Sequence, residues 1–175
     1  MLSAVIAAGD DPVELAETLA ALVPAAMEGL VREAIVVADR PNQAVRALAD
    51  AAGARLVEAS GGPAAAWRAG AGVARGPWLL LLVAGLSPTP GWADVAARAL
   101  ARPARPGAAF AFGVRSEGAR LATLMLGARG LATRLTRRPS PEHGLMVRAV
   151  DWRDMHGRPK VERLAATLLD NRRER

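Results

Sequence analysis

The chain has 175 residues, of which 51% are hydrophobic and 23% are charged, so its composition excludes a disordered chain and fits one domain with a hydrophobic core. It contains no cysteine, which excludes disulfides, thiolate metal ligands and cysteine nucleophiles. Its two histidines, His143 and His156, leave little room for a histidine-based metal centre. The formal net charge of +6 has two interpretations: a phosphate-bearing or membrane partner, or a compositional bias towards arginine without any block of like charge.

The N-terminus and the apolar runs bear on where the protein resides. Met1–Gly9 lacks a basic region, and its apolar run is too short for a signal peptide. The longest aliphatic run, Trp78–Leu86, has nine residues, whereas a membrane-spanning helix needs about 20. We therefore expect a cytoplasmic protein, or one that is peripheral to a membrane, and no nucleic-acid partner.

Short β-like runs alternate with helical patterns over the first 115 residues, which predicts a mostly parallel sheet with right-handed crossovers. The predicted strands are Ser3–Ala8, Ala34–Ala38, Arg55–Glu58, the central strand Trp78–Val83, and Phe110–Val114. The predicted helices between them begin at Asp11-Pro12, Pro41, Gly61-Gly62-Pro63 and Thr89-Pro90. We therefore expect a three-layer α/β/α fold with a mostly parallel central sheet, in a single domain of residues 1–175.

Several residues mark where these helices begin and end. Asp11-Pro12-Val13-Glu14 is typical of a capping box with proline at the first helical position. Pro24 predicts the end of that helix. Gly53 predicts the C-cap of the next helix, which we expect over Pro41–Ala52.

The last third of the chain has a different pattern. Leucines at helical spacing predict a long helix over Ala119–Leu135, with arginines lying away from the apolar stripe. Gly144–Val150 is strand-like, and Lys160–Leu169 predicts a final helix. Arg172–Arg175 predicts a frayed tail.

Ligands of parallel α/β sheets bind at the carboxyl ends of the strands, where the strand order reverses. The loops predicted at that edge are Gly9–Asp11, Asp39–Asn42, Gly61–Pro63 and Ala84–Pro90. In chain order, the segments AIVVADRPNQA, SGGPAAAWRAGAGVARGPWLLLL, VAGLSPTPGW and GLMVR resemble the family 2 glycosyltransferases. The resemblance covers most of the chain and implies a GT-A fold, like that of nucleotide-diphospho-sugar transferases. It also implies a nucleotide-binding half over residues 1–115 and a shortened acceptor-side half over residues 116–175.

The resemblance implies that the partner is a nucleotide-sugar, held at the first two of these loops. Asp39 falls on the family's aspartate at the end of the second strand, whose carboxylate accepts hydrogen bonds from the nucleotide base. The alternative is that Asp39 only caps the helix that begins near Pro41. Asp10 and Asp11 fall on the family's first loop, which also touches the nucleotide, although capping is a sufficient role for Asp11.

The family's metal motif is missing from this chain. After the central strand the family places a carboxylate that holds the Mg²⁺ or Mn²⁺ bridging the diphosphate of the sugar donor. Here the aligned residues are Val83, Ala84 and Gly85, and no carboxylate lies between Trp78 and Asp94. We therefore expect no metal ligands and no metal cofactor, although the resemblance implies Mg²⁺ or Mn²⁺ for the family.

The family's general base is also missing. The resemblance places a Glu-Asp pair, whose aspartate is the base, at Lys160-Val161. Glu162, two positions along from this pair, would substitute as a catalytic carboxylate if the loop shifts, and is otherwise a solvated residue in the first turn of the final helix. His143 is either a catalytic acid or base or a surface histidine.

The donor loop differs too, because Pro63 and Ala66 replace the family's arginine and glutamine. Together these losses favour a family 2-like protein that has lost metal-dependent sugar transfer and retains nucleotide or sugar binding, or serves as a partner subunit. Whether the chain is an enzyme stays open at this point.

Two other function classes remain. Ala4–Gly9 resembles the start of the molybdenum-cofactor guanylyltransferases, which are nucleotidyltransferases, although Asp10 and Asp11 would repel the phosphates that such a loop binds. Residues 119–138 combine an apolar stripe with a basic edge. That pattern suits a membrane surface or a protein partner, and equally a helix packed on the sheet.

Overall fold

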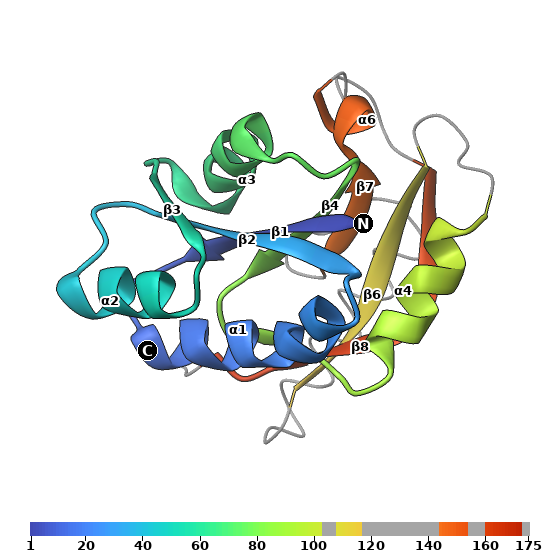
Figure 1. The fold of residues 1–175 in the computed structure, drawn as a ribbon, viewed down its shortest axis with the longest axis horizontal. Helices are drawn as coiled ribbons and strands as arrows, with labels where there is room; N and C mark the ends of the chain where they lie inside the picture. The colour runs from blue at the N-terminus through green and yellow to red at the C-terminus, as the bar shows by residue number, and fades with distance from the viewer. Residues whose placement is uncertain (103–107, 117–143, 154–159, 173–175) are drawn as a thin grey trace.

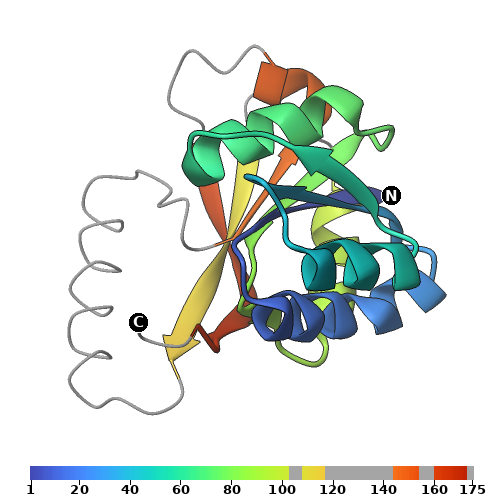
Figure 2. The same ribbon diagram turned by 90° about the vertical axis from the view of Figure 1, so that its left-hand side faces the viewer.

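The structure is a computed structural model, and it describes residues 1–102, 108–116, 144–153 and 160–172. These residues form an eight-stranded sheet with helices on both faces (Figure 1 and Figure 2). The strands are β1 (Leu2–Ala8), β2 (Val31–Ala38), β3 (Arg55–Glu58), β4 (Trp78–Val83), β5 (Leu86–Pro88), β6 (Ala108–Ser116), β7 (Leu145–Arg148) and β8 (Lys160–Asp170). The helices are α1 (Pro12–Met27), α2 (Gln43–Ala51), α3 (Gly62–Val73), α4 (Trp92–Leu100) and α6 (Ala149–Arg153).

The strand order is β3-β2-β1-β4-β7-β6-β8-β5. The pairs β2–β3, β1–β2, β1–β4 and β6–β8 are parallel, whereas β4–β7, β6–β7 and β5–β8 are antiparallel. The predicted fold class, a mostly parallel sheet between two layers of helices, is confirmed.

The sheet is buried on both faces because its central strands β1 and β4 carry apolar side chains at every position except Ser3. Ile6 and Leu82 belong to the hydrophobic core beneath α1, α2 and α4, whereas Val5 and Leu81 belong to the core beneath α3 and α6. Figure 1 shows these two groups of helices on opposite sides of the sheet. Strand β4 lies between β1 and β7 with the bounds expected for the central strand, Trp78–Val83.

The four strands β1 to β4 end at the same edge of the sheet. Ala8 pairs with Ala38, Ala38 pairs with Glu58, and Ala7 pairs with Val83. The chain leaves β1 towards the face covered by α1 and enters β4 from the face covered by α3. The strand order therefore reverses between β1 and β4, which is where open α/β sheets bind ligands.

The start of α1 is as expected, but its end is not. The Asp11 carboxylate accepts a hydrogen bond from the Val13 backbone N–H at 2.8 Å, and Pro12 is the first helical residue. Pro24 does not end the helix, which continues to Met27. Pro24 and Ala20 both lie on the exposed face, so water can hydrate the Ala20 carbonyl that loses its N–H partner.

The predicted final helix over Lys160–Leu169 is wrong, because this segment is strand β8. It pairs with β6 in parallel and with β5 in antiparallel orientation. The apolar residues of its second half satisfy helical spacing and also alternate, and the alternation decides the outcome: Ala166 and Leu168 are buried whereas Ala165 is exposed. Pairing on both sides of β8 overrides its helical propensity.

The strand-like run Gly144–Val150 is a strand only over Leu145–Arg148, and helix α6 follows it at once. The long helix predicted over Ala119–Leu135 lies outside the described residues, as does His143. Within the described part of the chain, no helix is both long enough and apolar enough to cross a membrane.

Candidate functional site

A pocket of about 300 Å³ opens at the carboxyl edge of the sheet, where the strand order reverses between β1 and β4. Its walls are formed by the ends of β1, β2 and β4, the beginning of α3 and the residues after β8. The lining residues are Ala7, Ala8, Gly9, Glu14, Val37, Asp39, Ala59, Gly62, Pro63, Ala66, Val83, Ala84 and Arg172. Most of the wall is therefore apolar, with Glu14, Asp39 and Arg172 as its charged residues.

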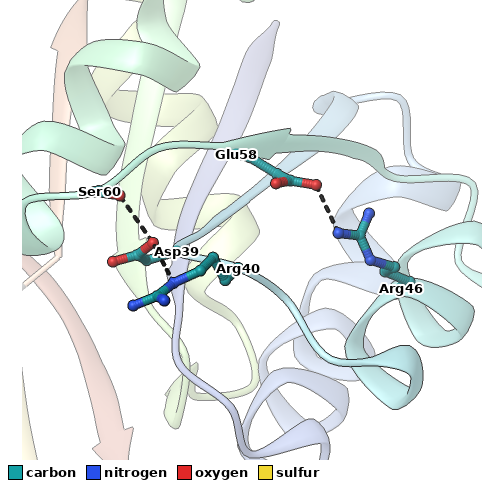
Figure 3. Close-up of polar contacts among 5 residues, drawn as sticks. All are labelled: Asp39, Arg40, Arg46, Glu58 and Ser60. Carbon is teal, nitrogen blue, oxygen red and sulfur yellow. Dashed lines mark hydrogen bonds and ion pairs between the residues drawn. The ribbon is translucent and has the colours of Figure 1, made fainter.

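Asp39 follows β2 directly and lines this pocket. Its Oδ1 accepts a hydrogen bond from the Ser60 hydroxyl at 2.8 Å and lies 3.7 Å from Nε of Arg40. Figure 3 shows that both contacts approach one carboxylate oxygen, while the other points away from Ser60 and Arg40. The side chain is 48% exposed, so Asp39 is held in place by one oxygen and presents the other to solvent.

Asp39 does not cap the helix that follows it. The N-cap of α2 is Asn42, whose Oδ1 accepts a hydrogen bond from the Val45 backbone N–H at 2.9 Å. The side-chain amide of Asn42 also donates to the carbonyl oxygen of Asp10 at 2.8 Å. This bond joins the loop after β1 to the loop after β2, which places Asp10 beside the pocket but not among its lining residues.

The neighbouring carboxylate at this edge is paired differently. Glu58, at the end of β3, accepts a hydrogen bond from Arg46 of α2 at 2.6 Å (Figure 3).

Arg40 adopts a left-handed backbone conformation with φ of 51°, which costs about 1–2 kcal/mol for a residue other than glycine. Strain of this kind persists where the surrounding structure fixes the backbone, and it is common in ligand-binding loops.

The loop after β4 contains no side chain that suits a divalent cation. Mg²⁺ and Mn²⁺ take oxygen ligands, whereas Val83 and Ala84 present hydrocarbon to the pocket. The Gly85 carbonyl accepts a hydrogen bond from the Asn171 N–H at 2.8 Å, and the Gly85 N–H donates to the Thr18 hydroxyl at 2.9 Å. The described residues contain no group of three or more His, Asp or Glu side chains that would hold a metal ion.

Arg172 is the pocket residue that the sequence interpretation missed, since Arg172–Arg175 was expected to be a frayed tail. Its Nη2 and Nε donate to the two carboxylate oxygens of Asp170 at 2.6 and 2.8 Å. Burial by itself raises the pKa of Asp170, but the hydrogen bonds and charge of Arg172 outweigh it and lower that pKa. A strand over residues 160–170 predicts that Arg172 lies at the carboxyl edge of the sheet. The expected helix over this segment gives no such prediction.

Glu162 lies away from the pocket lining. It is an exposed residue of β8, not a residue in the first turn of a helix, and its register partner is Phe110 of β6. Its Oε1 accepts a hydrogen bond from Arg102 at 2.6 Å. The structure therefore does not bring Glu162 together with Asp39, and His143 lies outside the described residues.

The fold is that of the GT-A glycosyltransferases. A crystal structure of a mycobacterial protein superposes on it with a TM-score of 0.68 and 18% sequence identity, covering 100% of this chain and 68% of that chain. Protein-family models give no match to this chain. Curated proteins give no match either.

Several similar structures are those of glucosyl-3-phosphoglycerate synthase from Mycobacterium tuberculosis. Its complex with Mn²⁺ and UDP-glucose has a TM-score of 0.67 and 17% identity, covering 100% of this chain and 72% of that chain. Its complex with Mg²⁺ and UDP has a TM-score of 0.66 and 16% identity, with the same coverage. At these identities the similarity establishes the fold.

Proposed function

We propose that this chain is a family 2-like glycosyltransferase domain that binds the nucleoside of a nucleotide-sugar at Asp39 and lacks metal-dependent sugar transfer. Residues 1–115 supply the nucleoside site in this proposal. The observation that carries it is the exposed carboxylate oxygen of Asp39 at the rim of a pocket at the strand-order reversal.

The chemistry of Asp39 suits a nucleobase with ring N–H donors. A carboxylate is an acceptor only, so it pairs with the imide N–H of uracil or the corresponding N–H of guanine. The Ser60 hydroxyl holds Oδ1 and thereby fixes the direction of the other oxygen before a ligand arrives. Because Asn42 caps α2, Asp39 has no capping role that would compete with base recognition.

The size and walls of the pocket agree with this assignment. Ligand pockets range over about 300–1,000 Å³, so the volume of about 300 Å³ lies at the lower end of that range. Val37, Ala59 and Ala66 give the pocket apolar walls against which a base can pack.

The absence of metal-dependent transfer is supported by the donor set around the pocket. Glucosyl-3-phosphoglycerate synthase, which has this fold, has been crystallised with Mn²⁺ and UDP-glucose. In this chain Val83, Ala84 and Gly85 offer no side-chain oxygen to such an ion. The residues present therefore do not fit a cation in the position that the family uses.

The two alternative functions have less support. A nucleotidyltransferase would bind phosphate at the start of α1, but the Asp11 carboxylate already accepts a hydrogen bond from Val13 N–H there. A membrane-surface or protein-interaction module would depend on residues 119–138, which lie outside the described residues.

Titration calorimetry with UDP, GDP and CDP in EDTA tests the proposal. We expect UDP or GDP to bind, and CDP to bind at least about tenfold more weakly, because cytosine presents a bare ring nitrogen where uracil has an N–H. Asp39→Asn should lower the affinity for the preferred nucleotide about tenfold or more. Asp50→Asn, an exposed carboxylate on α2, is the matched control and should bind like the unaltered protein.

Two results would contradict the proposal. Equal affinity of Asp39→Asn and Asp50→Asn for the nucleotide would remove the base-binding role of Asp39. Binding or sugar transfer that requires Mn²⁺ would show that the metal site is intact after all.

A further inference from the structure

We infer that Arg172 binds the diphosphate of the nucleotide-sugar and takes the place of the divalent cation in this pocket. This inference rests on the nucleoside site proposed at Asp39. It adds the second half of the ligand and names the residue that would recognise it.

Arg172 lies at the opposite end of the pocket from Asp39. In strand order the pocket runs from the end of β2 past β1 to β4, with Asp39 at one end and Val83 and Ala84 at the other. Asn171 is hydrogen-bonded to Gly85, so Arg172 is fixed beside the loop after β4. A ligand with its base at Asp39 would therefore direct its phosphates past Gly9 towards Arg172.

The charges that line the pocket also favour Arg172. Among the described residues that line the pocket, Arg172 alone is cationic, and Glu14 and Asp39 are acidic. The donor-loop positions Pro63 and Ala66 have no side-chain hydrogen-bond donor. Recognition of a diphosphate in this pocket therefore falls to Arg172, whose guanidinium keeps its positive charge and has five N–H donors, of which Nε and Nη2 also contact Asp170.

The surrounding residues hold the Arg172 side chain in place. Asp170 accepts two hydrogen bonds from the guanidinium, which fixes its orientation. Gly85 provides the space: a Cβ at this position would collide with Cγ of Arg172. The arginine side chain is nevertheless 32% exposed, so a ligand can reach it.

Calorimetry with uridine and UDP in EDTA separates the two halves of the site. We expect UDP to bind about tenfold or more tighter than uridine without any metal. Arg172→Gln should leave uridine affinity unchanged and reduce the preference for UDP to about twofold or less. Arg98→Gln, an exposed arginine on α4, is the matched control and should retain the preference.

A measurement on the unaltered protein makes the test independent of whether Arg172→Gln folds. The Nε–H resonance of Arg172 in an NMR spectrum should shift on addition of UDP and not on addition of uridine. The inference would be overturned if the Arg172 resonance does not shift with UDP, or if Arg172→Gln still prefers UDP over uridine. In either case, uridine binding that depends on Asp39 would leave the proposed function standing. Failure of both uridine and UDP to bind would overturn both.

Discussion

The backbone N–H of Asn171 donates a hydrogen bond to the carbonyl oxygen of Gly85 at 2.8 Å. This bond fastens the residues after the last described strand to the loop that follows the central strand. Together with the pairing of Leu86 with Asp170, it makes the C-terminal segment part of a pocket otherwise built by the first half of the chain.

Replacing Gly85 with alanine should destabilise the protein by more than the free energy that a positive φ alone costs an alanine. Gly85 has φ of 84°, and an added Cβ would also collide with Arg172. We expect Gly85→Ala to lower the free energy of unfolding by roughly 1–3 kcal/mol in urea denaturation. Gly91→Ala is the matched control, because Gly91 has φ of 82° and nothing within 4 Å of the added Cβ. Equal losses in the two variants would mean that the collision has no energetic effect.

Two glycines of α3 should respond to alanine in opposite directions. A Cβ at Gly70 would collide with Cγ1 of Val5 and lie 3.2 Å from Cγ2 of Val37, whereas a Cβ at Gly72 meets nothing within 4 Å. Gly70→Ala should cost about 1–3 kcal/mol of stability through overpacking against the sheet. Gly72→Ala should raise stability by up to about 1 kcal/mol through helix propensity. Thermal unfolding of both variants provides the comparison, and a stabilised Gly70→Ala would contradict the close packing of α3.

The two hydrogen bonds of the Asn42 side chain can be separated by substitution. Asn42→Ala removes both the cap of α2 and the bond to the Asp10 carbonyl, and should cost about 1–2 kcal/mol in urea denaturation. Asn42→Asp keeps an oxygen for the cap and loses the donor to Asp10, so it should cost less. In both variants, amide hydrogen exchange of residues 9–11 should accelerate. Unchanged exchange in Asn42→Asp would show that this bond does not hold the loop.

The ion pair of Asp170 with Arg172 should make stability depend on pH. The pKa of Asp170 is lowered in the folded protein, so its contribution is present above the ordinary carboxyl pKa of 3.8 and is lost as the pH falls through the lower, folded value. The stability difference between the unaltered protein and Asp170→Asn should therefore shrink between about pH 5 and about pH 2 in urea denaturation. Asp50→Asn controls for the general loss of carboxylate charge. A difference that stays constant with pH would exclude a stabilising ionised Asp170.

The sequence predicts the first half of the fold closely, and the physical reason is local. Arg55–Glu58 and Trp78–Val83 have the predicted bounds because a glycine or Gly-Pro turn precedes each run and polar or small residues follow it. Strand β8 was assigned to the wrong structure because its apolar spacing satisfies two periods. Its pairing with β6 and β5, which are distant in sequence, decides between them.

The candidate site, like the fold, could be predicted only in part from the sequence. The sequence places Asp39 at the carboxyl edge because it follows an unambiguous strand, whereas only the structure shows that Asn42 is the residue that caps α2. Arg172 was not found, because its place in the pocket depends on β8 being a strand. Its place in the pocket can be derived only once the pairing of β8 with β6 and β5 is known.

The position of β8 between β6 and β5 also determines the order in which the molecule can be assembled. During synthesis β1 to β4 can pair as they emerge, since their contacts are made within the first 83 residues. Strand β5, at residues 86–88, has β8 as its neighbour in the sheet, and so waits for more than 70 further residues. Until then the part of the pocket formed by the ends of β1, β2 and β4 can exist without Arg172. A chain that has emerged only as far as β4 therefore has Asp39 in place but not Arg172, so the two ends of the pocket are completed at different times.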